Sequence, residues 1–161
     1  MLSDLTENKL HVQPTRSGTT AFQQWRDANF SPEEALDPAI SGFAANPDDD
    51  GLANIFEYLG GTSPREPSSA WLPSGELEDL TAAGLPGLWF TFRFRASPLI
   101  DDLRLLPQYS SDLINWSTSE PLYLRQRTLT PTLNEYVFRP PAPLAPANIR
   151  GFWRLQVIAQ P

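Results

Sequence analysis

The sequence predicts an α+β fold that is mainly β, in which a short helical segment packs on an antiparallel β-sandwich. Apolar residues recur at helical spacing before residue 61, whereas from residue 88 onward they alternate with polar residues. Seventeen prolines argue against a helical bundle and suit strands joined by rigid turns. We therefore divide the chain into a flexible arm (1–18), a helical segment (19–61), a linker or meandering connection (62–87) and a sandwich (88–161).

The composition excludes several classes of function. Twelve basic and 19 acidic residues give a formal net charge of −7, so the chain lacks the basic surface that binds nucleic acid or an anionic membrane. It has no cysteine and one histidine, His11, which excludes a thiolate zinc site and a multi-histidine metal site. No apolar run approaches the ~20 residues needed for membrane insertion, and no signal peptide is visible.

The helical segment contains two predicted helix starts. The first follows Thr19 or Thr20, and in residues 21–30 three aromatic side chains fall close to one helical face. The second begins at Ser31, because Ser caps well, Pro suits the first helical position and Glu follows three residues after the cap. This second helix is short, since Asp37-Pro38 interrupts it. The aromatic residues of the first helix are Phe22, Trp25 and Phe30.

Strands are predicted from residue 88 onward. Phe90, Phe92 and Phe94 alternate with polar or bulky neighbours, which is typical of a half-buried strand. Turn residues separate the later runs at short spacing, which indicates an antiparallel sandwich of the immunoglobulin or fibronectin type III kind rather than a parallel sheet with crossover helices. The further candidate strands are 103–110, 121–128, 134–139 and 151–158.

Residues 46–57 match the spacing of an EF-hand calcium loop that leads into a helix over about 53–59. Calcium takes six to eight oxygen ligands, and the EF-hand pattern places them at alternate positions, with Gly at position 6 and a helical Glu at position 12. Gly51 occupies position 6 here. The alternative is a solvated acidic turn that caps the helix. The predicted ligands are Asn46, Asp48, Asp50, the backbone carbonyl of Leu52, Asn54 (directly or through water) and Glu57.

The loop resembles the single calcium loops of dockerins and thrombospondin type 3 repeats. Together with later landmarks, it resembles a module common near the C-termini of large secreted bacterial proteins, over roughly residues 20–158. Asn46 stands where Asp is usual and Asp49 where Gly is usual, which implies weak binding, with a Kd of about 10⁻⁴ M. The landmarks are Trp25-Arg26, residues 46–58, Phe92-Arg93-Phe94-Arg95, Tyr109-Ser110-Ser111-Asp112-Leu113-Ile114-Asn115-Trp116 and Phe152-Trp153-Arg154-Leu155.

The resemblance implies a non-catalytic accessory module of an exported protein, secreted or at the cell surface, whose signal peptide lies outside this chain. Its expected partners are neighbouring domains of a larger parent chain, or a cell-surface glycan or protein. A dockerin-like docking role is weaker, because dockerins use two loops and we find one in this sequence.

Two other functions are alternatives to an accessory module. A carbohydrate-binding module would use exposed tryptophans, but we expect Trp116 in the sandwich core, and Trp89 and Trp153 covering the helical segment. An enzyme of the glycosidase kind would need two carboxylates across a cleft. The pairs Asp101-Asp102 and Glu76 with Glu78 are expected to be solvated charges outside any recognisable site pattern.

Overall fold

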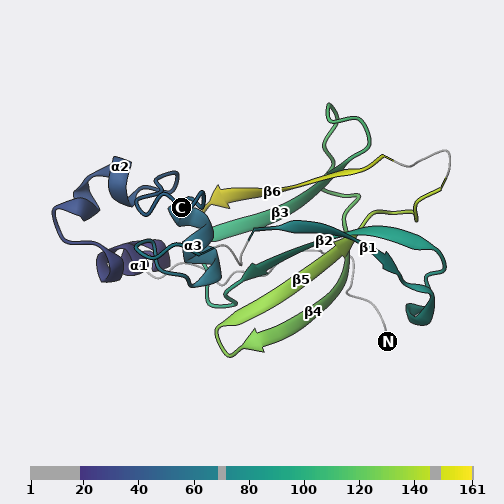
Figure 1. The fold of residues 1–161 in the computed structure, drawn as a ribbon, viewed down its shortest axis with the longest axis horizontal. Coiled ribbons are helices and arrows are strands. Elements are labelled where there is room, and N and C mark those ends of the chain that lie inside the picture. Colours follow the sequence, from purple (N-terminus) through teal and green to yellow (C-terminus); the bar gives the residue numbers. More distant parts are fainter. Residues whose placement is uncertain (1–18, 69–71, 146–149, 161) are drawn as a thin grey trace.

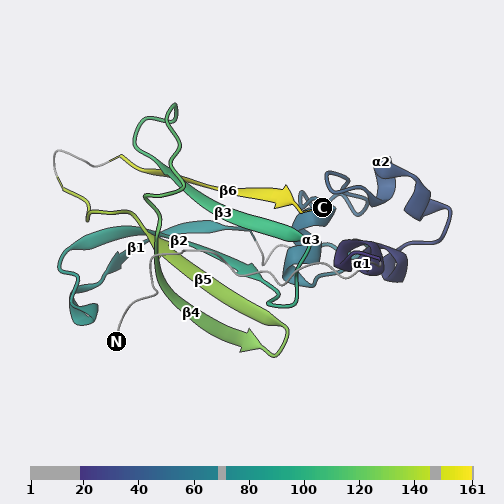
Figure 2. The same ribbon diagram turned by 180° about the vertical axis from the view of Figure 1, so that it is seen from behind.

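The computed structural model describes residues 19–68, 72–145 and 150–160. Short helices occupy one end of the long axis and two layers of strands occupy the other (Figures 1 and 2). The mainly β fold class is confirmed, since the strands pair in antiparallel sheets and the helices are short. The arm predicted over 1–18, with His11, lies outside the described residues.

The helical part begins where its capping residues predict. Helix α1 covers Ala21–Asn29, and the Thr20 hydroxyl accepts a hydrogen bond from the Gln23 backbone N–H at 3.1 Å. The Gln23 side chain returns a hydrogen bond by accepting from the Thr20 N–H at 2.9 Å, which completes a capping box. The second predicted helix is a single 3₁₀ turn over Glu34–Leu36, and α2 follows over Pro38–Ser41.

Helix α3 covers Asn54–Gly60 and joins the loop to the sandwich (Figure 1). It ends at Gly61, whose φ of 67° is the left-handed conformation that glycine adopts readily, and the Gly61 N–H donates to the Glu57 carbonyl. Tyr58 and Leu59 are buried, and Tyr58 meets the ring of Phe22 edge-on at 5.3 Å between centroids. In the described ranges no helix has the length and apolar character needed to span a bilayer.

The strands form two antiparallel layers. The larger sheet has the order β1-β2-β5-β4, and the smaller sheet pairs β3 with β6 (Figure 1). Every strand predicted from residue 88 onward is present within one or two residues of its expected ends. The observed bounds are β1 Ser74–Asp79, β2 Leu88–Ala96, β3 Leu103–Ser110, β4 Leu122–Thr130, β5 Leu133–Arg139 and β6 Phe152–Ala159.

The connection predicted over 62–87 contains a strand that the sequence pattern did not indicate. Strand β1 pairs antiparallel with β2, from Ser74 opposite Arg93 to Asp79 opposite Leu88. It lies at the edge of the sheet and is mostly exposed, so it needs no alternation of apolar side chains. Its backbone hydrogen bonds to β2 define it, and these depend on the tertiary fold.

The core lies between the two layers and continues into the helical part. Phe92 of β2 stacks on Trp153 of β6, with ring centroids 5.3 Å apart and planes 9° from parallel. The Trp153 indole N–H donates to the Phe90 carbonyl at 2.9 Å, so a β6 side chain is hydrogen-bonded to the opposite sheet. The buried core cluster comprises Phe22, Leu52, Tyr58, Leu59, Phe92, Phe94, Ala96, Leu103, Leu105, Tyr136 and Phe138.

A buried carboxylate joins the helical part to the sandwich. Asp102, at the start of β3, accepts hydrogen bonds from the Tyr58 hydroxyl and from the Phe22 backbone N–H, both at 2.7 Å. The Ser97 N–H donates to the Leu59 carbonyl at 2.9 Å in the same junction. Burial and the bond to Asp102 raise the pKa of Tyr58 above its ordinary range, so its hydroxyl remains a donor.

Candidate metal centre

The loop before α3 brings three of the predicted ligands together. One carboxylate oxygen from each of Asp48, Asp50 and Glu57 lies within 4.8 Å of the other two. Two residues of the loop have positive φ, Asp49 at 59° and Gly51 at 90°, and this allows the chain to turn sharply between the ligands. The sequence predicts both turns. Asp49 stands where calcium loops usually have Gly, and Gly51 stands at position 6, so both residues are expected to adopt a tight conformation.

Backbone pairing sets where α3 starts relative to the loop. The Asn54 N–H donates to the Ala45 carbonyl at 2.8 Å, and the Ile55 N–H donates to the Phe43 carbonyl at 3.0 Å. The Asn54 side-chain amide is fully buried and donates to the carbonyls of Ile40 and Gly42 at 2.9 and 3.0 Å. These bonds fix the first turn of α3, and with it Glu57, against residues 40–45, which lead into the loop that carries the other carboxylates.

Asp50 is the most firmly held carboxylate in the loop. It accepts from the Ser68 N–H at 2.6 Å and from the Leu52 N–H at 2.7 Å, and these bonds lower its pKa. Asp48 accepts from the Asp50 N–H at 3.4 Å through one oxygen. These hydrogen bonds favour the ionised form of Asp50, and one oxygen of Asp48 is held beside it.

Glu57 differs from Asp50 in its hydrogen bonding. It is fully buried, and neither of its carboxylate oxygens has a hydrogen-bond partner. A buried polar atom without a partner costs roughly 1–3 kcal/mol, and more if charged. Three further orphaned oxygens belong to the predicted ligand set. They are Asn46 Oδ1, Asp48 Oδ2 and Asn54 Oδ1.

The electrostatics of the cluster are unfavourable to a third negative charge. Burial, followed by repulsion from Asp48 and Asp50, raises the pKa of Glu57 to about 7. Near neutral pH its carboxylate is therefore divided between the protonated and the ionised form. A bound cation would relieve this repulsion and satisfy the orphaned oxygens together.

The donor set fits a hard divalent cation. All the side-chain donors are carboxylate or amide oxygens, which calcium and magnesium prefer and zinc and copper do not. A solvated acidic turn does not account for a fully buried Glu57. Leu52 buries its side chain in the core, and the role of its backbone carbonyl as a ligand stays a prediction.

The tryptophans lie elsewhere than expected. Trp89 is buried, with the Arg139 guanidinium 4.9 Å from its ring centroid, at the β2 end remote from the helices. Trp153 belongs to the core, as described above. The expectation that Trp116 fills the core is wrong: it is half-exposed in the β3–β4 loop under the Arg154 guanidinium, 4.2 Å from the ring centroid.

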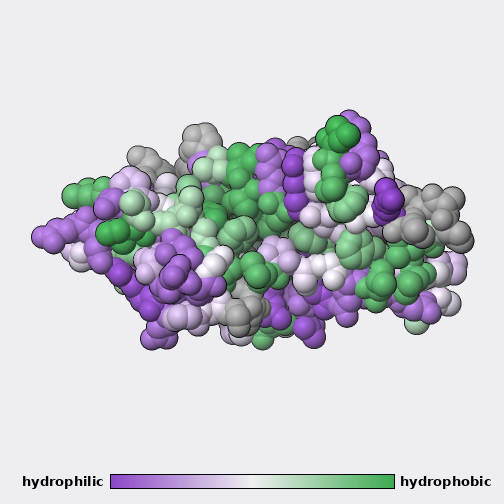
Figure 3. Space-filling view, turned by 45° about the horizontal axis from the view of Figure 1, so that its top comes forward, coloured by the Kyte–Doolittle hydropathy of each residue, from purple (hydrophilic) through white to green (hydrophobic). Residues whose placement is uncertain are grey.

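Hydrogen bonds within that loop hold its backbone, and its tip is apolar. Asp112 accepts hydrogen bonds from the N–H groups of Ile114 and Asn115, both at 2.8 Å, and its pKa is lowered by this bonding. The Trp116 indole donates to the Leu113 carbonyl at 3.2 Å, outside the sandwich. Leu113 and Ile114 are exposed, so the projecting tip is hydrophobic at its surface (Figure 3).

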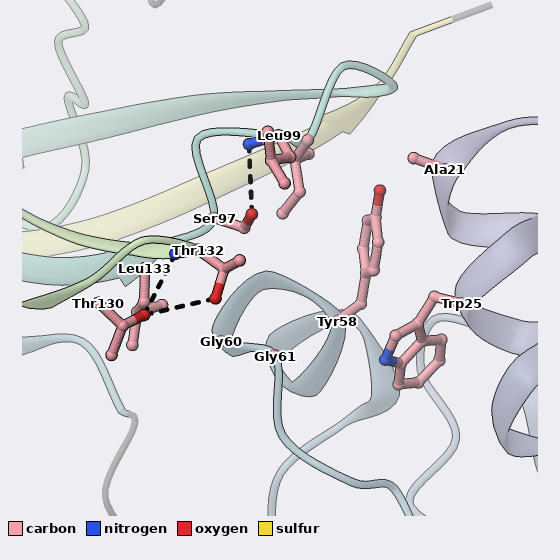
Figure 4. Close-up of a pocket in the computed structure, with 11 residues that line it drawn as sticks. Ala21, Trp25, Tyr58, Gly60, Gly61, Ser97, Leu99, Thr130, Thr132 and Leu133 are labelled. Atoms are coloured by element: carbon pink, nitrogen blue, oxygen red, sulfur yellow. Dashed lines mark hydrogen bonds between the residues drawn. The ribbon is translucent and has the colours of Figure 1, made fainter.

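A groove of about 360 Å³ lies where the helical part meets the sandwich (Figure 4). Trp25 and Tyr58 line one side, and Ser97, Leu99 and the turn at Thr130 line the other. Among the described residues that line it there is no carboxylate, histidine or cysteine. The groove therefore lacks the convergent acid and base groups of a hydrolytic site.

Two acidic residues that are expected from the sequence to be solvated have structural roles. Asp102 is buried and joins the two parts, so the expectation of a solvated pair with Asp101 is wrong for this residue. The side chain of Glu78 is mostly buried, and it binds the Thr91 hydroxyl at 2.7 Å and two arginines. Neither role has a signal in the local sequence, because the partners are distant along the chain.

No protein-family model, curated protein sequence or solved structure matches this chain. The resemblance of the loop to secreted calcium-binding modules therefore stays a prediction. The assignment of a function depends on the geometry of the loop and of the two parts that it joins.

Proposed function

We propose that this chain is a non-catalytic, calcium-stabilised accessory module that serves as a spacer, stabiliser or surface attachment in an exported bacterial protein. The observation that supports it best is the buried Glu57, whose two unpartnered oxygens lie beside Asp48 and Asp50. A carboxylate in this position is unfavourable to folding unless a proton or a cation neutralises it.

The proposed ion stabilises the contact between the helical part and the sandwich. Glu57 is followed directly by Tyr58 and Leu59, which pack in the shared core, and the Tyr58 hydroxyl donates to Asp102. Holding Glu57 in place therefore holds α3 in the orientation that buries both neighbours. A ligand that binds only the folded state adds about 2.7 kcal/mol when its concentration is a hundredfold above Kd.

Asn46 in place of the usual Asp leaves three charged ligands, and weak sites of this kind suit extracellular calcium concentrations. This supports the proposal of a secreted or cell-surface location. The partners in this proposal are neighbouring domains of a parent chain, with a cell-surface glycan or protein as the target of attachment.

Metal-stripped protein should melt at a lower temperature than protein in millimolar calcium, measured by differential scanning calorimetry. Asp48→Asn should reduce this calcium response. Asp49→Asn is the matched control, because it removes the same charge from an exposed neighbour outside the cluster. An identical melting temperature with calcium and with chelator, or equal responses of the two variants, would show that the cluster is not a calcium site.

The alternatives gain less support from the geometry. A sugar-binding row of Trp89, Trp116 and Trp153 would need three exposed rings, but Trp89 is buried and Trp153 packs in the core. A dockerin-like role would use two loops, and the proposal here concerns one.

A further inference from the structure

The segment that follows α3 returns to the loop of residues 46–57. It begins at the C-terminal end of α3, where the Thr62 N–H donates to the Glu57 carbonyl at 3.0 Å. Further along the segment, the Ser68 N–H donates to Asp50 Oδ2 at 2.6 Å. Asp50 and Ser68 are 18 positions apart, so a pattern of twelve consecutive residues cannot include this contact. A residue from outside the loop therefore borders the carboxylate cluster.

The hydroxyl of Ser68 is buried and unpartnered. Its Oγ has no hydrogen-bond partner among the described residues. Three covalent bonds separate this oxygen from the nitrogen that donates to Asp50, so it lies close to the same carboxylate. Glu57 is a second, independent pointer to a cation here, because it is fully buried with two unpartnered oxygens and its carboxylate belongs to the cluster.

Unpartnered buried atoms are concentrated in this region of the molecule. In the part of the chain that the structure describes, eight buried side-chain N or O atoms have no partner, and seven of them lie between residues 46 and 68. All seven are oxygens, the element that a calcium ion binds. The eighth is Arg93 Nε, on β2. The shortage of hydrogen bonds therefore includes both the loop and the segment that returns to it.

Thr62 belongs to the same segment, and its hydroxyl is also buried without a partner. It lies at the C-terminal end of α3, whereas the side chains of a helix lean toward its N-terminus. The Glu57 carboxylate therefore points away from Thr62 and toward Asp48 and Asp50. Of these two hydroxyl-bearing residues, Ser68 is the one that contacts a carboxylate of the cluster.

Asp50 has capacity for a cation as well as for Ser68. Its Oδ1 accepts from the Leu52 N–H and its Oδ2 accepts from the Ser68 N–H. An ionised carboxylate offers about four lone-pair sites, so two backbone hydrogen bonds leave room for a metal ion. A serine hydroxyl is neutral, so it supplies an oxygen ligand beside the carboxylates without adding to their mutual repulsion.

We propose that a calcium ion at this site takes a further ligand from outside the loop, the hydroxyl oxygen of Ser68. This proposal rests on the calcium-binding function proposed above and extends the ligand set beyond residues 46–57. Glu57 lies on α3 and Ser68 lies in the segment that returns from it, so the ion holds both to the loop. Calcium then fixes residues 62–68, which lead toward β1, as well as the direction of α3.

The test is isothermal titration of calcium into the metal-stripped full chain. Ser68→Ala keeps the backbone N–H that binds Asp50 and removes the hydroxyl alone. It should raise the Kd for calcium about tenfold or more, since even groups that only orient the ligands of a metal typically contribute that much. Ser68→Thr keeps a hydroxyl and should retain most of the native affinity.

The matched control is Thr62→Val, which removes another buried, unpartnered hydroxyl from the same segment and should change the Kd less than about twofold. Urea denaturation in chelator separates a ligand from a structural group. Ser68→Ala should be at least as stable as the native protein there, because its hydroxyl has no hydrogen bond to lose.

Three results would overturn the assignment of Ser68. They are an unchanged calcium Kd in Ser68→Ala, an equal loss of affinity in Thr62→Val, and a loss of stability of Ser68→Ala in chelator. In each of these cases the native chain still binds calcium, so the proposed function survives. If the native chain binds no calcium, the proposed function fails, and the assignment of Ser68 fails with it.

Discussion

Replacing Glu57 by glutamine is expected to have opposite effects on stability with and without calcium. Glutamine has nearly the same shape but no charge, so in metal-stripped protein it removes a carboxylate that burial and two neighbouring carboxylates disfavour. In calcium it removes the ligand that closes the proposed site from the first turn of α3. If Glu57 had a purely structural role, its replacement would destabilise the fold both with and without calcium.

The size of the effect follows from the pKa of Glu57. Its rise from 4.5 to about 7 corresponds to about 3 kcal/mol of unfavourable free energy for the ionised form above pH 7. Screening by solvent around the loop lowers this, so we expect metal-free Glu57→Gln to be more stable than the native protein by about 1–3 kcal/mol. In excess calcium the native protein gains about 2.7 kcal/mol, the linkage expected at a hundredfold excess over Kd, so the variant loses its advantage and should be less stable by up to about 1.7 kcal/mol.

The assay is urea denaturation at pH 8, followed by tryptophan fluorescence, in calcium and in chelator. Asp49→Asn again serves as the control, since it changes the loop charge by the same amount without touching the cluster. If Glu57→Gln is less stable than the native protein in chelator, the electrostatic reasoning fails. If the two proteins respond equally to calcium, Glu57 is not a ligand.

Three further outcomes are expected. The free energy of unfolding of metal-free native protein should fall as pH rises from about 4.5 to about 7, because the folded state holds the proton of Glu57 more tightly than the unfolded chain does; a pH series of urea melts checks this. Asp102→Ala should destabilise by about 2–4 kcal/mol in chemical denaturation, since it leaves a buried N–H and a buried hydroxyl without an acceptor, whereas exposed Asp101→Ala should change stability by less than about 0.5 kcal/mol. Trp153→Phe should cost about 1–2 kcal/mol through loss of its indole hydrogen bond across the sandwich, and Trp116→Phe much less, as compared by thermal melting.

Local sequence determined the helix boundaries and most of the strands. Thr20 and Ser31 cap the turns that follow them because their hydroxyls reach backbone N–H groups only a few residues away. The alternation in β2 predicted that Phe92 and Phe94 lie on one face, which is the face in the core, since side chains of a strand point alternately to its two faces. The loop spacing likewise predicted that Asp48, Asp50 and Glu57 converge.

Strand β1 and the location of Trp116 depend on tertiary contacts and could not be predicted. The β1 sequence contains one apolar side chain, and its pairing partner is supplied by β2. Trp116 lies outside the core because the Arg154 guanidinium and the Leu113 carbonyl hold it in a loop. Neither interaction leaves a local pattern, because Arg154 is distant in sequence and the second partner is a backbone group.

The sequence by itself therefore determined the chemistry of the loop, because ligand type and spacing are local properties of twelve consecutive residues. Only the tertiary structure decided that Glu57 is fully buried with both oxygens unpartnered, since that burial depends on how α3 packs between the helices and the sandwich. It also decided that Asp102 joins the two parts. In each case groups far apart along the chain become neighbours only when the sheets and helices pack.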